Sequence, residues 1–297
     1  MRRGYPLQGM RRRHFAAGII GGPGTFAWLA FQHLQRAYGW TCRVQYFESA
    51  DTLLMALVEG SIDVTCVAVQ TSHSGFTPML QQVLRNPPLG PIGEMILPYD
   101  CTLYVREGHD LAQVRLVLGH RSLELASEWL RRHLPEARQE ARRSTVEAAR
   151  EVAQGDGALA VVGSPALAQF VPGLRAAARG IDGGAVARWW ALSRAPTCEA
   201  RFDRAVVVGC SVSAHVLAGL LATLLPLGLE LAALYTEPVP ATAFLSNCVL
   251  LIGDHGADSS ALKKAAGRAS SSFRLVSAFR LVADCPPADG PDLARPA

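Results

Sequence analysis

The stretch 144–192 constrains the fold more than any other part of this sequence, because helix and strand signals alternate within it. Ser144 precedes an apolar series at helical spacing, and Glu147 stands three residues later, which together form a capping box. After a Gly-Asp-Gly break, Ala158–Val162 is an all-apolar run, typical of a parallel strand covered on both faces. Ser164 and Pro165 predict the start of a second helix, and a return strand follows. The stretch therefore predicts an α/β fold.

Similar signals extend this alternation toward the N-terminus. The prolines and glycine of Asn86–Pro91 predict a crossing point between two parts of the domain. The expected strands are His14–Ile20, Val44–Phe47, Val64–Val69, Glu94–Val105 and Arg115–Leu118, and the expected helices are Phe26–Tyr38, Ala50–Glu59 and 120–133.

Composition excludes several classes of protein. The 297 residues are 49% hydrophobic and 18% charged, so the chain can bury a core, and its length suggests two domains. A net charge of +4, without a basic patch interleaved with aromatic residues, argues against nucleic acid as a partner. Seven irregularly spaced cysteines without a CxxC pair fit neither a disulfide framework nor a zinc site. We expect buried thiols in a reducing compartment.

The N-terminal segment 1–13 is rich in arginine, and the apolar run after it is short. Glycine and proline interrupt this run too early for a secretory signal or a membrane span. We therefore expect a disordered N-terminus, a cytoplasmic protein and no contact with a membrane.

Three helix N-termini are candidate anion sites, because unpaired N–H groups and the helix dipole favour negative charge there. They stand at Gly24 and Thr25, at His120 to Ser122, and at Ser144 and Thr145. If they converge, they suit a small ligand with more than one carboxylate. Capping alone also explains Ser144, and a turn histidine without a role explains His120.

A polar run, Gln70, Thr71 and Ser72, follows the expected strand Val64–Val69. It stands at the carboxyl end of that strand, where open α/β sheets bind their ligands. A solvent-exposed loop has the same composition, so the position of this run, more than its polarity, indicates a site.

The chain beyond a linker near 193–203 has the order βαββαβ, which fits a ferredoxin-like module. Residues 285–297, rich in proline, form a tail. The expected elements are Ala205–Cys210, Val216–Leu227, Leu229–Tyr235, Ala243–Ile252, Ser259–Ser271 and Phe273–Ala283.

The chain resembles the prephenate dehydratase family followed by an ACT regulatory domain. The family's Gly-Pro-x-Gly-Thr-Phe-Ser opening is similar to Gly21–Ala27, its Ser-His-Pro-Gln-Ala-Leu segment to Gly119–Glu124, and its Ser-Thr-x-x-Ala-Ala motif to Ser144–Ala149. The ACT likeness rests on Gly228–Pro238, similar to the family's Gly-Ile-Asn-Leu and Glu-Ser-Arg-Pro run.

The resemblance implies a two-lobed α/β domain of the periplasmic-binding-protein type (type 2) at 14–195, with prephenate in the cleft between its lobes. Lobe 1 would comprise about 14–94 and 177–195, and lobe 2 about 95–176, with the ACT-like domain at 204–284. No cofactor and no metal are implied.

Residue by residue, the resemblance also implies a site. Its catalytic residues would be Arg188, Ser72 and His120. Its substrate-binding residues would be Gly24, Thr25, Gln70, Thr71, Ser122, Ser144, Thr145, Ala187 and Trp189. Trp189 or Trp190 can cover the ring of the substrate, or both can belong to the core.

Several of these positions depart from the family. Gln70, Thr71 and Ser72 replace Glu-Asn-Ser, and Ser122 replaces a glutamine that faces the substrate. The Thr-Arg-Phe motif aligns with 187–189, where Arg188 keeps the ability to hold a carboxylate in a bidentate manner. The threonine, associated in the family with protonating the departing ring hydroxyl, is an alanine.

This loss favours a reaction that keeps the ring hydroxyl. Dehydration expels carbon dioxide and hydroxide together and needs a proton donor at the hydroxyl. Without that donor, carbon dioxide can leave while a ring carbon is protonated, as in relatives similar to prephenate decarboxylases of secondary metabolism. The alternatives are ordinary dehydration to phenylpyruvate for phenylalanine biosynthesis and a sensor of an aryl or prephenate-like acid without chemistry.

The ACT-like module departs from its family as well. The Gly-Ala-Leu turn, which approaches phenylalanine closely in the family, starts with His215 here, and Glu-Ser-Arg-Pro reads Tyr235, Thr236, Glu237 and Pro238. A bulky ring and a reversed charge disfavour the usual ligand. The apolar stripe of Val216–Leu227 favours packing on a partner subunit. We therefore expect a homo-oligomer that is insensitive to phenylalanine.

Overall fold

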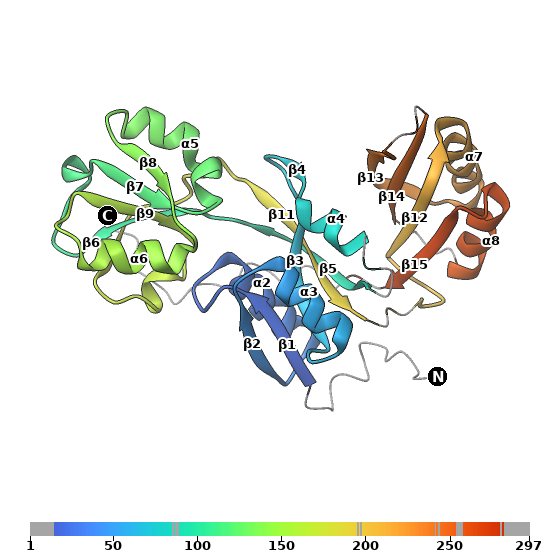
Figure 1. The fold of residues 1–297 in the computed structure, drawn as a ribbon, viewed down its shortest axis with the longest axis horizontal. Coiled ribbons are helices and arrows are strands. Elements are labelled where there is room, and N and C mark those ends of the chain that lie inside the picture. The colour runs from blue at the N-terminus through green and yellow to red at the C-terminus, as the bar shows by residue number, and fades with distance from the viewer. Residues whose placement is uncertain are drawn as a thin grey trace.

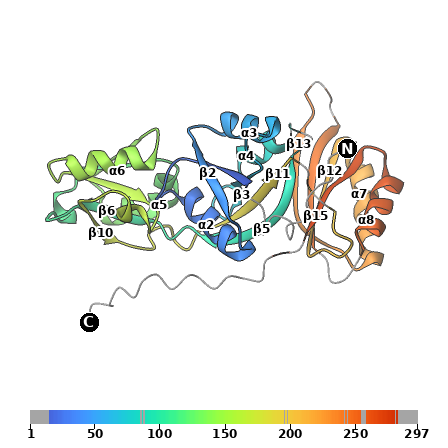
Figure 2. The same ribbon diagram turned by 90° about the horizontal axis from the view of Figure 1, so that it is seen from below.

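The computed structural model describes residues 15–281, apart from 85, 87–88, 195, 197, 241, 243, 254–257 and 280. The segments 1–13 and 285–297, expected as a disordered N-terminus and a tail, lie outside the described residues. The described chain forms three sheets that lie in a row in both views (Figures 1 and 2), with lobe 1 in the middle and the C-terminal module at one end.

The sheet of lobe 1 has the strand order β2-β1-β3-β11-β5, with β4 paired to β3. β1 pairs in parallel with β2 and β3, whereas β11 lies antiparallel between β3 and β5. Helices α2 and α3 have the bounds expected from the sequence, but β4 and α4 were not expected. The elements are β1 (Phe15–Ile20), α2 (Phe26–Tyr38), β2 (Cys42–Phe47), α3 (Ala50–Glu59), β3 (Val64–Thr71), β4 (Gly75–Phe76), α4 (Pro78–Leu84), β5 (Gly90–Pro98) and β11 (Val186–Ser193).

The sheet of lobe 2 has the order β10-β6-β9-β7-β8, in which β7, β8 and β9 run parallel. The prediction of a helix after Ser164 and Pro165 is wrong, because the segment forms only a 3-10 turn at Leu167–Gln169. Pro172 ends it, since the residue before a proline avoids the helical region. The other elements are β6 (Thr102–Arg106), β7 (Leu116–Gly119), α5 (Ser122–His133), β8 (Arg138–Ala141), α6 (Thr145–Gln154), β9 (Leu159–Gly163) and β10 (Leu174–Ala178).

The chain crosses between the lobes later than the sequence suggested. The single strand expected at Glu94–Val105 is two strands, β5 in lobe 1 and β6 in lobe 2, separated at Asp100, whose φ is 50°. The chain returns to lobe 1 between β10 and β11, where the Tyr99 N–H donates to the Ala185 carbonyl at 2.9 Å. The crossing point expected at Asn86–Pro91 is wrong, because Asn86 and Leu89–Pro91 stand between two elements of lobe 1, α4 and β5, or at the start of β5, whereas Pro87 and Pro88 lie outside the described residues. The first lobe boundary moves from residue 94 to about Pro98.

The C-terminal module has the expected βαββαβ order and the antiparallel strand order β13-β14-β12-β15 of a ferredoxin-like fold. Its elements are β12 (Arg204–Ser213), α7 (Ala214–Leu224), β13 (Glu230–Pro238), β14 (Leu245–Gly253), α8 (Ser259–Ala269) and β15 (Phe273–Phe279).

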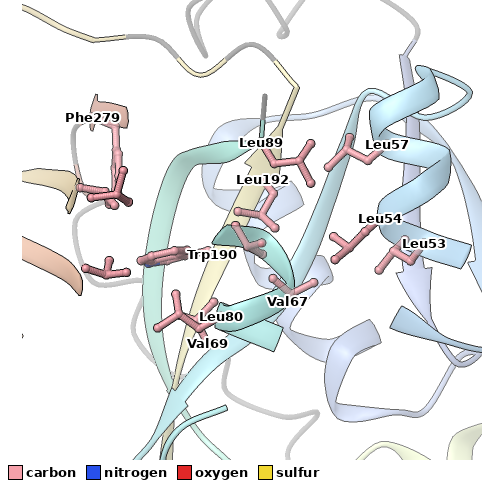
Figure 3. Packing of buried hydrophobic residues seen from close by; sticks show 14 of the residues in the cluster. Leu53, Leu54, Leu57, Val67, Val69, Leu80, Leu89, Trp190, Leu192 and Phe279 are labelled. Carbon is pink, nitrogen blue, oxygen red and sulfur yellow. The ribbon is translucent and has the colours of Figure 1, made fainter. Parts of the chain in front are cut away.

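The first half of the inner strand β12 is buried on both faces of the module's sheet. Ala205 and Val207 pack against the two helices, whereas Val206 and Val208, which alternate with them, pack in one cluster with lobe 1. Figure 3 shows Trp190 of lobe 1 on the side toward Phe279 of the module. The apolar run Ala205–Val208 thus reflects burial on both sides, by the module's own helices and by lobe 1.

Candidate functional site

The parallel strands of both lobes end where the lobes meet. β1 runs into α2, and the hydroxyl of Ser164, just after β9, donates to the Gly24 carbonyl at 2.5 Å. Open α/β sheets bind ligands at this edge. We call the region the lobe junction; it comprises residues 21–25, 70–74, 119–122, 144–145, 163–167 and 186–188.

The glycine-rich turn before α2 accommodates lobe 2. Gly24 has a φ of +85°, and a Cβ at this position would lie 3.1 Å from the Phe170 ring and 3.4 Å from the Leu167 Cα. The Thr25 hydroxyl accepts from the Trp28 N–H at 3.2 Å and therefore caps α2. The sequence suggested that a ligand lies close to the backbone at Gly24, but in the structure residues of lobe 2 lie there instead.

The helix ends of lobe 2 have different roles. Ser144 caps α6, because its hydroxyl accepts from the Glu147 N–H at 3.1 Å. Thr145 begins α6 and is half-buried beside Gly163. Ser122 is 4% exposed and donates to the Val162 carbonyl at 2.9 Å, so its hydroxyl is turned toward β9 and not toward a substrate. This placement corrects the expectation for Ser122.

His120 is exposed and stands just before α5. Desolvation of its ring and the charge of Arg121 lower the pKa of His120, while Glu124 opposes the shift. A lowered pKa favours the neutral imidazole near pH 7, which can donate a hydrogen bond to an anion.

The polar run Gln70 to Ser72 forms the last two residues of β3 and the residue after it, and its side chains bond within the chain. The Thr71 and Ser74 hydroxyls lie 2.9 Å apart, and the side-chain amide oxygen Oε1 of Gln70 accepts from Arg188 Nε at 3.0 Å. Ser72 pairs with Val186 through two hydrogen bonds, one from the Ser72 N–H at 2.9 Å and one to its hydroxyl at 3.0 Å. Ser72 therefore fixes the start of β11.

Successive residues of β11 face opposite sides of the sheet. Ala187 and Trp189 pack with α2 and are 1% and 6% exposed. Trp190 packs on the other face and donates from Nε1 to Glu94 at 2.9 Å. Both tryptophans are buried, which agrees with the alternative that they belong to the core.

Arg188 shares its face with Trp190 and pairs with the same carboxylate. Its Nη1 group contacts Glu94 Oε1, which also accepts from Arg204 Nε at 3.2 Å. Within the described residues, the Nη2 group of Arg188 has no hydrogen-bond partner. We call Glu94, Arg188, Trp190 and Arg204 the Glu94 cluster.

Glu94 and Arg204 were not expected from the sequence to belong to a site. A usable signal was present, because Glu94 is the only charged residue in β5, whose sequence is GPIGEMILP. An acidic side chain in an apolar strand is buried only if it is paired, and Glu94 is 2% exposed. Its partners stand far apart in the sequence, so only the fold identifies them.

Tyr235, expected at the regulatory position, faces lobe 1. Its hydroxyl accepts from Gln81 Nε2 at 2.6 Å and donates to Glu237 at 3.0 Å. His215 and Thr236 are exposed. A cavity of about 160 Å³ lies between the module and lobe 1, and its lining includes Val83, Trp190, Val208, Glu237 and Arg274.

Other features bear on the expected class of protein. Six cysteines in the described part of the chain are free, and Cys198 and Cys210 are exposed, which corrects the expectation of uniformly buried thiols. Across residues 15–281, with the gaps given above, no group of His, Cys, Asp or Glu is arranged to hold a metal ion. No helix in those residues is long and apolar enough to cross a membrane.

The architecture is a two-lobed α/β domain followed by a ferredoxin-like module, and comparison with known proteins assigns its family. The model of the prephenate dehydratase family matches residues 17–197, well over half of the chain. The chain belongs to the prephenate dehydratase family.

Sequence relatives match over part of their length. The prephenate dehydratase of Amycolatopsis methanolica is 31% identical over 125 residues, which cover 41% of this chain and 40% of that protein. The prephenate dehydratase of Mycobacterium tuberculosis H37Rv is 32% identical over 136 residues, 45% of this chain and 42% of that protein. The matches thus span about two fifths of these relatives.

Solved structures share the fold over a longer range. The prephenate dehydratase of Arthrobacter aurescens, solved in complex with L-Phe, has a TM-score of 0.76 at 22% identity and covers 89% of both chains. GqqA, described as a novel type of quorum quenching acylase, has a TM-score of 0.73 at 18% identity and covers 89% of this chain and 97% of its own. At these identities the likeness establishes the fold alone.

We predict that Ser164→Ala weakens the contact between the lobes. The substitution leaves the buried Gly24 carbonyl without its donor, which costs about 1–3 kcal/mol. Urea unfolding measures this loss. Ser61→Ala is the control, because Ser61 is exposed and its hydroxyl bonds only within one turn, so the change should stay within about 0.5 kcal/mol. Equal stabilities of both variants would contradict the assigned contact.

Proposed function

We propose that this protein binds prephenate at the lobe junction and decarboxylates it with retention of the ring hydroxyl. Membership of the prephenate dehydratase family supports the substrate class. The observation that carries the choice of reaction is Ala187, which is 1% exposed among apolar side chains where the family has a threonine. A methyl group cannot protonate a leaving hydroxyl.

The proposed reaction needs one proton and no redox partner. The bond between the ring carbon and its carboxylate breaks, carbon dioxide leaves, and the electron pair moves into the ring. A proton then adds to a ring carbon, which gives a non-aromatic dihydro-hydroxyphenylpyruvate. Arg188 would hold a carboxylate of the substrate through its Nη2 group, and neutral His120 would donate a hydrogen bond from lobe 2.

Dehydration to phenylpyruvate is the second candidate, and one contact favours it. Thr71 lies directly opposite Ala187 in the pairing of β3 with β11. The Thr71 hydroxyl is therefore next to the position where the family has its donor threonine. That hydroxyl bonds to Ser74. A sensor without chemistry is the third candidate, favoured by the number of junction hydroxyls that are used in caps and strand contacts.

Incubation of the purified protein with prephenate separates these functions. Carbon dioxide release without phenylpyruvate absorbance is the expected result. Phenylpyruvate absorbance would instead identify a dehydratase. Calorimetric binding of prephenate without either product would identify a sensor, and absence of binding would refute the substrate.

We predict that Ala187→Thr raises phenylpyruvate formation relative to the wild type. The substitution restores a hydroxyl at the position of the family's donor. Ala187→Val is the matched control, because valine has the shape of threonine without the hydroxyl. If threonine and valine give the same products in folded protein, the missing donor does not determine the reaction.

Arg188→Ala should weaken prephenate binding by about 2–4 kcal/mol, because a charge-assisted contact is lost from a largely buried site. Arg188→Lys keeps a positive charge beside Glu94 and controls for stability, but a lysine lacks the planar fork and should not restore affinity. Calorimetry measures both variants. Unchanged affinity of Arg188→Ala would remove Arg188 from the site.

We also propose a homodimer formed partly through the C-terminal module and insensitive to phenylalanine. β13 is an edge strand of its sheet, Leu231 on it is 40% exposed, and Leu225 nearby is 78% exposed. Sedimentation should give a dimer at micromolar concentration, and Leu231→Lys should shift it toward monomer. Micromolar phenylalanine binding by calorimetry would contradict the regulatory part, and a monomeric wild type would contradict the structural part.

A further inference from the structure

Arg204 connects the C-terminal module to the lobe junction. It is the first residue of β12, and its Nε group lies 3.2 Å from Glu94 Oε1 on β5. Only 14% of the Arg204 side chain and 1% of the Glu94 side chain are exposed. This ion pair is therefore largely withdrawn from water and is screened little by salt.

Three side chains from two strands, β11 and β12, hold Glu94. Arg188 and Arg204 both contact Oε1, and Trp190 Nε1 donates to Oε2 at 2.9 Å. Because both guanidinium groups share one oxygen, a change at Arg204 alters the position and charge of the acceptor that holds Arg188. Among the described residues of the module, Arg204 alone has this link to Arg188.

The charges in the cluster are unequal. Glu94 brings one carboxylate against two guanidinium groups, so the three side chains together carry one excess positive charge. Arg188 is 13% exposed and stands at the lobe junction, whereas Arg204 lies on the side of the module. When Arg204 is present, the Glu94 carboxylate is shared between the two arginines, so the positive charge of Arg188 is only partly neutralised and can attract an anion. Without it, Glu94 would neutralise Arg188.

We propose that Arg204 is a positioning residue for the candidate site, acting through Glu94 on Arg188 to keep this guanidinium oriented and available to a substrate carboxylate. The inference rests on the proposed binding of a dicarboxylate at the lobe junction and not on which reaction follows. It assigns the C-terminal module a direct contribution to substrate affinity within one chain.

The test compares prephenate affinity among Arg204 variants by calorimetry. Arg204→Gln keeps a donor to Glu94 but loses the charge, and affinity should fall on the order of tenfold, within the usual range of coupling between sites. Arg204→Lys should retain most of the affinity. Arg268→Met, an exposed arginine on α8, is the control and should change nothing.

A double-variant comparison separates positioning from general stability. In an Arg188→Lys background, Arg204→Gln should cause little further loss of affinity if it acts through Arg188. Equal losses in both backgrounds would overturn the inference, as would an Arg204→Gln variant with wild-type affinity.

A readout without substrate keeps the test decisive if prephenate does not bind. The NMR signal of the Arg188 Nε–H group is identified by its absence from the spectrum of Arg188→Lys. Its chemical shift should change in Arg204→Gln and not in Arg268→Met. An unchanged Arg188 signal would overturn the inference. A shifted signal without prephenate binding would refute the proposed substrate alone.

Discussion

The burial of a single carboxylate determines how this molecule is assembled. Glu94 is 2% exposed, and a charge in such a place is tolerated only when donors surround it. The donors come from β11 and β12, so the carboxylate joins the middle of lobe 1 to the first strand of the C-terminal module. Arg204 supplies part of this compensation from the module, and for this reason the two parts of the chain depend on each other.

Regular elements were largely predictable from the sequence. α2 and α3 were expected with the observed bounds, because glycine stands at the C-terminal end of each and Thr25 and Ser49 cap them. The break between β5 and β6 was missed, although Pro98 ends β5 two residues before Asp100, because apolar and aromatic residues continue on both sides of it. The short edge strand β8, which is exposed along its whole length and polar except for Ala141, gives no apolar alternation to detect.

The candidate site was harder to predict, for a physical reason. Hydroxyl side chains at helix starts and strand ends can bind a ligand or satisfy the backbone, and sequence does not distinguish these uses. Thr25, Ser144 and Ser72 all bond to backbone groups of this chain, and Ser122 does so too. The position of Glu94 beside Arg188 depends on strand pairing between residues far apart in the chain. No local pattern contains that information.

The placement of β11 has a consequence for the order in which the protein folds. It lies between β3 and β5, yet all of lobe 2 separates it from them in the chain. During synthesis, the facing edges of β3 and β5 stay unpaired until lobe 2 has left the ribosome, and unpaired edges are where strands of other molecules attach. The five strands of lobe 2, β6 to β10, follow one another in the chain without a strand of lobe 1 between them, so the sheet of lobe 2 can form first. The nascent chain is therefore most exposed to aggregation just before its last strand of lobe 1 arrives.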